Sequence, residues 1–140
     1  MKFDESISYL LARVGVAHRK TLERTAAKVG LHGGQIFVLM ELWKKDGLRQ
    51  VDLATRLELA PPTVNKILGG LLEGDLVTRS KYEDDARSTR IFLTEKGSRA
   101  QALLEAEWDA LEEQTIVNLT DTEVLVLKQL LMRLLEHIEI

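Results

Sequence analysis

Residues 49–81 read RQVDLATRLELAPPTVNKILGGLLEGDLVTRSK. Apolar residues recur at helical spacing over 51–58 and again over 61–73, and only residues 59 and 60 separate the two segments. The two prolines that open the second segment are compatible with a first helical turn, where the N–H of the first residue has no intrahelical partner. Two helices joined by so short a connection form a helix-turn-helix arrangement.

After Gly74 the apolar residues change from helical spacing to alternation. Residues 76–82 alternate, residues 90–94 alternate again, and the polar segment EDDARS at 83–88 lies between them. This pattern predicts a β-hairpin with its loop at 83–88. A hairpin directly after a helix-turn-helix makes it a winged helix-turn-helix.

Helical patterns flank this unit on both sides. They cover residues 3–28 and 35–45 before it, and they resume from Thr94 and from Thr120 after it. Thr120 and Glu123 have the spacing of a capping box, which opens the last helix. The predicted fold class is mainly α, with a small two- to three-stranded β wing, and joins a winged helix-turn-helix domain to a helical region.

Composition excludes several functional classes. The 140-residue chain has no cysteine and only three histidines, which are scattered, so we expect no catalytic residues, no metal site and no cofactor. No apolar run reaches the roughly 20 residues that span a bilayer, and the N-terminus does not resemble a signal peptide. We therefore expect a cytoplasmic protein without a membrane partner.

Charge is distributed unevenly along the chain. Residues 1–100 contain 17 Lys and Arg against 13 Asp and Glu, whereas residues 101–140 contain 2 against 9. The acidity of the whole chain, net charge -3, therefore comes from its last 40 residues. A mildly basic body is compatible with a polyanionic partner.

The second helix of a helix-turn-helix enters the DNA major groove with its N-terminal residues toward the bases. In this sequence the helix over 61–73 would present Pro62, Thr63, Asn65 and Lys66. Asn can bond adenine through two hydrogen bonds, and Thr can contact a thymine methyl group or a phosphate. For the helix alone, a solvated surface without a partner explains the same residues.

The hairpin would add basic side chains in the minor groove, over residues 79–92. Its candidates are Arg79, Lys81, Arg87 and Arg90, with Asp85 two residues before Arg87 and able to orient it. The alternative for Asp85 and Arg87 is an exposed ion pair worth about 0–1 kcal/mol. Replacing Arg87 by alanine is expected to weaken DNA binding without changing folding.

Several motifs together resemble the MarR family of winged helix-turn-helix transcriptional regulators. The resemblance covers nearly the whole chain and rests on these residues: Gln35, Leu39 and Leu42; Leu53-Ala54; Thr63-Val64 and Leu71; Leu76-Val77 and Arg79; Asp85, Arg87, Leu93-Thr94, Lys96 and Gly97. The sequence departs from the pattern at Asp75, where glycine is usual, at Gly69-Gly70, where polar residues are usual, and at Ala86, where a second arginine is common.

The resemblance implies a homodimer in which residues 1–30 and 98–140 form a helical dimerisation region and residues 31–97 bind DNA. It implies a sequence-specific double-stranded DNA-binding regulator, a ligand-responsive repressor on a pseudo-palindromic operator. The alternative function is a winged-helix protein-interaction module without sequence-specific DNA binding.

The resemblance also implies a small aromatic or phenolic effector, bound between the dimer helices and the winged domain. By position, the candidate ligand residues are Leu11, His18, Trp43 and Trp108. The alternative is that both tryptophans belong to the core and that His18 lies on a helix surface.

Overall fold

The computed structural model describes residues 1–81 and 89–138 of the chain. In chain order its elements are η1 (Phe3–Glu5), α1 (Ile7–Lys28), α2 (Gly33–Lys44), β1 (Leu48–Arg49), α3 (Gln50–Leu57), α4 (Pro61–Glu73), β2 (Val77–Lys81), β3 (Thr89–Leu93), α5 (Glu95–Thr115) and α6 (Asp121–His137). The predicted fold class, mainly helical with a small β wing, is confirmed.

The sheet has three antiparallel strands in the order β1-β3-β2. β3 pairs with β2 from Val77↔Leu93 to Lys81↔Thr89, and it pairs with β1 at Leu48↔Ile91 and Arg49↔Arg90. The hairpin of β2 and β3 was predicted by the alternation. β1 is too short, at two residues, for a period to indicate it.

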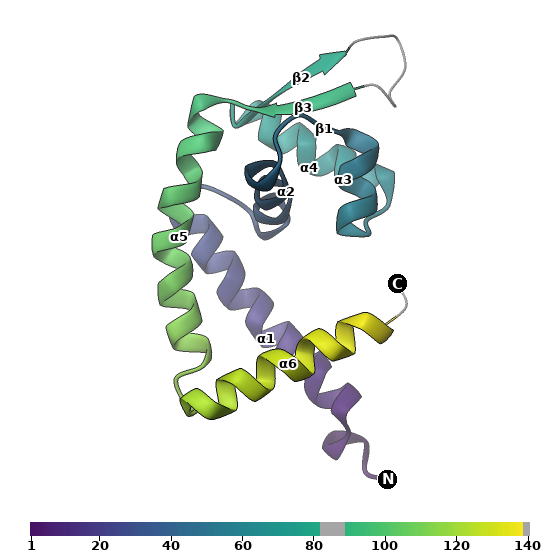
Figure 1. The fold of residues 1–140 in the computed structure, drawn as a ribbon, viewed down its shortest axis with the longest axis vertical. Coiled ribbons are helices and arrows are strands. Elements are labelled where there is room, and N and C mark those ends of the chain that lie inside the picture. The colour runs from purple at the N-terminus through teal and green to yellow at the C-terminus, as the bar shows by residue number, and fades with distance from the viewer. Residues whose placement is uncertain (82–88, 139–140) are drawn as a thin grey trace.

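The winged unit, which comprises α2, α3, α4 and the three-stranded sheet, lies at one end of the molecule (Figure 1). The sheet covers α3 and α4, α2 packs against both of these helices, and α5 leads away from the wing along one side. α1 packs against α5, and α6 turns back from the foot of α5. The recognition-helix candidate α4 is therefore held between α2, α3 and the base of the wing.

The core consists of aliphatic side chains from all elements of the winged unit. Ile36 and Leu39 of α2, Leu53 of α3, Leu68 of α4 and Ile91 of β3 have no exposed surface. Burial of one such side chain contributes about 1.5–3 kcal/mol. This shared core fixes α4 relative to the wing.

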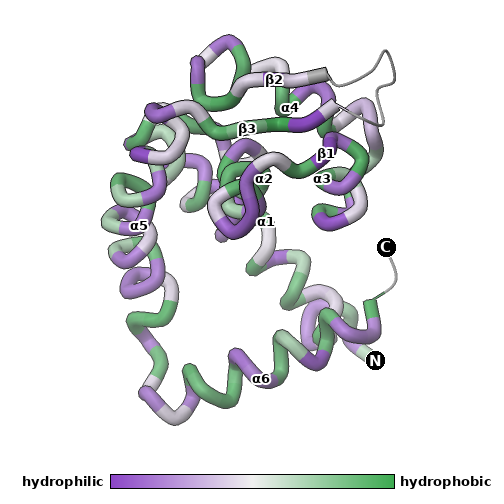
Figure 2. The backbone as a smooth tube through the Cα atoms, turned by 45° about the horizontal axis from the view of Figure 1, so that its top comes forward, coloured by the Kyte–Doolittle hydropathy of each residue, from purple (hydrophilic) through white to green (hydrophobic). Residues whose placement is uncertain are grey.

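The terminal helices expose most of their apolar residues. None of the residues of α6 is buried, and the buried residues of α1 all lie in its last two turns. Figure 2 shows hydrophobic segments recurring along α6, away from the winged unit. Among the exposed residues of α6 are Leu125, Val126, Leu127, Leu130, Leu131, Met132, Leu134 and Leu135.

Two helix starts differ from the sequence prediction. The period predicts a helix from Phe3, but α1 begins at Ile7, where the Ser6 side chain accepts a hydrogen bond from the Tyr9 N–H. α2 begins at Gly33, two residues earlier than the pattern indicates. Its first N–H donates to both carboxylate oxygens of Glu23 on α1, at 3.1 Å each. A residue distant in sequence therefore caps the Gly33 N–H, in addition to the local contact in which the Gln35 Oε1 accepts from the His32 N–H at 3.0 Å.

Two predicted helix starts are confirmed. The Thr94 side chain accepts from the Gly97 N–H at 3.0 Å and opens α5. The Thr120 hydroxyl accepts from the Glu123 N–H at 3.2 Å, and the Glu123 carboxylate accepts from the Thr120 N–H at 3.0 Å. These bonds form the predicted capping box of α6.

Candidate nucleic-acid interface

The N-terminal half of α4 is an exposed polar surface above a buried apolar stripe. Val64, Leu68 and Leu71 are buried, whereas the predicted contact residues of this helix are all exposed. These residues are Pro62, Thr63, Asn65 and Lys66. The structure thus places them together on the side of α4 that does not pack against the core.

Two prolines shape the start of α4. The N-cap residue is Ala60, whose side chain makes no capping bond, and Pro61 and Pro62 follow it. Prolines have no N–H, and the Thr63 N–H donates to the Ala60 carbonyl at 3.0 Å. The first turn therefore leaves few unpaired N–H groups, and recognition here depends on side chains.

Gln50, the first residue of α3, contacts Asn65 across the helix-turn-helix. Its Nε2 donates to the Asn65 Oδ1 at 3.3 Å. In this arrangement the Asn65 Oδ1 faces Gln50. Sequence reasoning missed Gln50, because the two residues are 15 positions apart and no local pattern links them.

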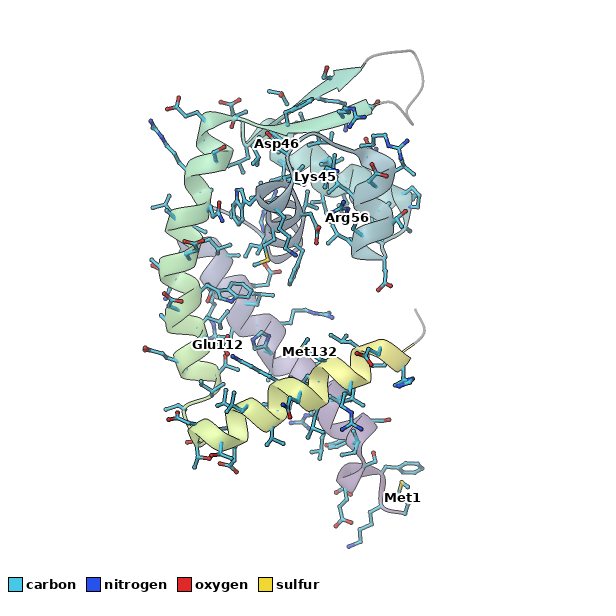
Figure 3. The ribbon with its side chains drawn as sticks, viewed as in Figure 1. Met1, Lys45, Asp46, Arg56, Glu112 and Met132 are labelled. Carbon is cyan, nitrogen blue, oxygen red and sulfur yellow. The ribbon has the colours of Figure 1, made fainter. Side chains whose placement is uncertain are left out.

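The base of the wing is tied to the end of α2 by polar contacts. Asp46, labelled in Figure 3, accepts from the N–H groups of Gly47 and Leu93 through the same Oδ1, each at 2.9 Å. The Arg90 guanidinium donates to the Gly47 carbonyl at 2.9 Å and is half-buried. Arg90, predicted as a DNA contact, therefore holds the base of the wing in this structure.

Two of the other predicted wing residues lie on β2, and two lie outside the described residues. Arg79 lies on β2 and is exposed. Lys81 is the last residue of β2. Asp85 and Arg87 lie outside the described residues. Arg79 and Arg90 therefore lie on one hairpin but at unpaired positions, since Arg79 is opposite Ile91 and Arg90 is opposite Ser80.

Arg49, which sequence reasoning also missed, lies opposite Arg90 in the sheet. Its Nε and Nη2 donate to the two carboxylate oxygens of Asp52, each at 3.0 Å. The same hydrogen bonds lower the pKa of Asp52 and raise the pKa of Arg49, with the Coulombic attraction acting in the same direction. This paired geometry sets the Arg49 charge at the edge of the sheet nearest α3.

A second candidate site is a hollow between α2 and α5, which we call the α2–α5 hollow. Its volume is about 290 Å³, and its apolar walls are Met40, Trp43, Leu104 and Trp108. The Trp43 indole N–H donates to the Gly97 carbonyl at 2.9 Å, at the start of α5. Of the four predicted ligand residues, the structure brings Trp43 and Trp108 together here, whereas Leu11 and His18 do not line the hollow.

Comparison with known proteins assigns the family. The model of the MarR family matches residues 31–89, which contain α2, the helix-turn-helix and β2 and end at the first residue of β3. Residues 31–89 are a MarR-family domain. This confirms the family that the sequence motifs indicated.

Similar proteins agree with this assignment. The HTH-type transcriptional regulator TtmR of Methylorubrum extorquens is 36% identical over 63 residues, which are 45% of this chain and 32% of that protein. The chain thus matches about a third of the length of that relative. The structure of a MarR-family transcriptional regulator from Rhodococcus sp. RHA1 is 25% identical, has a TM-score of 0.83, and is matched over 96% of this chain and 95% of that chain.

A further solved structure holds a small molecule. The Mycobacterium tuberculosis MarR-family protein Rv2887, in complex with salicylic acid, is 26% identical with a TM-score of 0.71, over 92% of this chain and 96% of that chain.

Within the described residues of the present chain, no helix is long and apolar enough to cross a membrane. The same residues contain no group of three or more His, Asp or Glu side chains that could hold a metal ion.

Two departures from the usual MarR-family pattern have structural reasons. Asp75 takes the glycine position with a φ of 58°, so it adopts the left-handed conformation itself and the turn is not shifted. Gly70 packs against Gln35, whose Nε2 would lie 2.8 Å from a Cβ at that position. At Gly69 no atom lies within 4 Å of such a Cβ, so its lack of a side chain has no packing reason.

Proposed function

We propose that this chain is a sequence-specific, double-stranded DNA-binding transcriptional regulator that acts as a cytoplasmic, ligand-responsive repressor without enzymatic activity. The observation that carries this proposal is the exposed polar surface of α4, held by a shared core beneath a wing with exposed Arg79. The names of TtmR and of the Rhodococcus protein, both transcriptional regulators, support it.

On DNA, α4 would lie in the major groove and the wing, residues 79–92, in the minor groove. Base contacts would come from Pro62, Thr63, Asn65 and Lys66. Wing contacts would come from Arg79, Lys81, Asp85, Arg87 and Arg90. Because Lys66 is the single basic residue of α4, most of the charge attraction to phosphates would come from outside this helix.

We also propose that the protein works as a homodimer. Residues 1–30 and 98–140 would form the dimerisation region, and residues 31–97 would form the DNA-binding domain. The exposed apolar residues of α6 support this, because a second copy of the same surface would bury them. A twofold dimer requires a pseudo-palindromic operator with half-site centres about 10 base pairs apart.

Selection of bound sequences from a random duplex pool tests the proposal. We expect enrichment of a pseudo-palindromic motif, bound with an affinity that falls as salt rises. The slope of log affinity against log salt should be shallower than about -8, because α4 contributes few charges. A pool without an enriched motif would instead indicate a winged-helix module that binds another protein.

An effector site is the last part of the proposal. The α2–α5 hollow joins a helix of the winged unit to the helix that leaves the wing, and Trp43 is bonded to the start of that second helix. A ligand on Trp43 would therefore act directly on the junction between α5 and the wing. The salicylic acid complex of Rv2887 supports a small-molecule response in a protein of this fold.

A further inference from the structure

The α2–α5 hollow has an aromatic lining that contains every tryptophan of the chain. The sequence has two tryptophans, and both Trp43 and Trp108 line the hollow. Both are half-buried, so part of each ring is packed against the core and part remains accessible. The hydrogen bond from the Trp43 indole to the Gly97 carbonyl holds that ring in one position. The two indoles offer ring faces with negative potential to a ligand.

The charged residues of the hollow are mainly acidic. Glu105 and Asp109 both line it, and they are four residues apart on α5, so their carboxylates lie one turn apart on the same side of the helix. Two like charges at this spacing destabilise a helix slightly. A bound cation would relieve that repulsion, whereas a bound anion would add to it.

One ammonium group also lines the hollow, on Lys44. Its Nζ lies 3.7 Å from the Glu41 Oε1, so this charge already has a carboxylate partner from the same helix. Glu105 has only a neutral partner among the described contacts, since it accepts a hydrogen bond from the Gln101 amide at 3.3 Å. The charge that the hollow presents to a ligand is therefore negative.

We propose that the α2–α5 hollow binds an organic cation, an amine or quaternary ammonium ion on an apolar body of about one ring. The inference rests on the proposed effector site and gives its chemical class. The ammonium would lie against the indole faces beside Glu105 and Asp109, and the apolar body would contact Met40 and Leu104. The volume of about 290 Å³ is at the low end for ligand pockets, which limits the ligand to a small body.

An organic cation differs in charge from salicylic acid, the ligand in the similar Rv2887 structure. Salicylic acid is an aromatic acid, and in this hollow its carboxylate would lie close to Glu105 and Asp109. Desolvating an anion beside two carboxylates is unfavourable. The lining therefore discriminates against aromatic acids and in favour of amines.

Calorimetric titration of the full-length protein with three small probes tests the inference. The probes are benzyltrimethylammonium, benzyl alcohol and salicylate, which share one ring and carry a positive, zero and negative charge. We expect the cation to bind about tenfold or more tighter than either of the others. Because both tryptophans line the hollow, the cation should also change the intrinsic tryptophan fluorescence.

A charge-removing variant identifies the groups responsible. Glu105→Gln with Asp109→Asn keeps the side-chain shapes and should reduce cation affinity about tenfold while leaving benzyl alcohol unchanged. Trp108→Leu should reduce cation affinity as well. Glu112→Gln removes a carboxylate from the same helix outside the hollow and should have no effect (Glu112 is labelled in Figure 3). Circular dichroism melts verify that each variant is folded.

Three results would overturn the inference. They are salicylate binding as tightly as the cation, cation affinity unchanged in the double variant, and no binding of any probe. None of these measurements involves DNA. The proposed regulator function is judged separately, by the sequence selection described above, so one proposal can fail while the other stands.

Discussion

The winged unit and the last helix, α6, use their apolar residues in opposite ways. In the winged unit, Leu39, Leu53 and Leu68 have no exposed surface, whereas in α6 Leu125 is 64% exposed and Leu135 is 70% exposed. Hydrophobic stabilisation follows the apolar area removed from water. The winged unit therefore obtains its stabilisation within one chain, and in the proposed dimer α6 would gain further stabilisation from the second copy.

The largest effect should come from placing charges on α6. Leu127 and Leu131 are 40% and 41% exposed in the single chain. Changing both to aspartate would bury two unpaired carboxylates from each chain in a dimer, so we expect the protein to become monomeric. DNA affinity should fall about 100-fold or more, because two linked DNA-binding units hold an operator far more tightly than one.

Sedimentation equilibrium and fluorescence anisotropy measure these two effects. Val51→Asp is a matched control, since Val51 is 43% exposed but lies on α3 in the winged unit. It should keep the dimer mass. A double variant of α6 that still sediments as a dimer would break the comparison, because α6 would then not be the surface that assembles.

The next effect concerns the exposed polar surface of the winged unit. Asn65→Ala should reduce discrimination at one base position of the operator by about 1–3 kcal/mol, and dimer mass should not change. Gln50→Ala should relax the same position by a smaller amount, because Gln50 holds the Asn65 amide in place.

A double-mutant cycle across a panel of operator variants checks this. If Gln50 acts through Asn65, its effect should be absent in the Asn65→Ala background. Equal effects of Gln50→Ala in both backgrounds would show that the two side chains act independently. Gln50→Glu is a useful companion, because a carboxylate cannot donate to the Asn65 oxygen at neutral pH.

Most helices, the hairpin and two helix starts could be predicted from the local sequence. The helical period located α4, the alternation located the hairpin, and Thr94 and Thr120 indicated helix starts that the structure confirms. These features depend on residues within a few positions of one another. The helical pattern that resumes at Thr120 also predicted α6, and only the structure shows how much of its apolar surface is exposed.

The parts that sequence missed all depend on distant contacts. Glu23 caps α2 from ten residues away, and Gln50 reaches Asn65 across a turn. Arg90 donates to the Gly47 carbonyl 43 residues away, so its partial burial was not visible in the charge pattern. The acidic lining of the α2–α5 hollow likewise required α2 and α5 to be placed side by side.

A smaller effect is expected on the free energy of unfolding, which should respond differently to alanine at two neighbouring glycines of α4. Gly69→Ala should stabilise the protein by about 1 kcal/mol, because alanine is the better helix former and no atom lies within 4 Å of the new Cβ. Gly70→Ala should gain less or lose stability, because its Cβ would meet the Gln35 Nε2 at 2.8 Å. Urea unfolding measures both variants. Equal stabilisation by the two would show that the packing of α2 on α4 is looser than the structure indicates.

The smallest effect is a pH dependence in each region. The Arg49 hydrogen bonds lower the pKa of Asp52 in the winged unit, and the Thr120 N–H lowers the pKa of Glu123 on α6. A carboxylate with a lowered folded pKa stabilises the protein above its unfolded pKa, about 4. This contribution is lost as the pH falls through the folded value.

Asp52→Asn and Glu123→Gln should therefore destabilise the protein at pH 7 and approach wild type below about pH 4. Both effects should be small, since the Asp52 side chain is 33% exposed and the surrounding water and salt screen its charge. The two variants should differ in how their destabilisation depends on protein concentration. Urea unfolding at several protein concentrations measures this dependence. The Asp52 effect should be independent of concentration, because the Arg49 bond lies within one chain. The Glu123 effect should grow on dilution if α6 is stabilised mainly in the dimer, and an effect independent of concentration would mean that α6 is stable in the single chain.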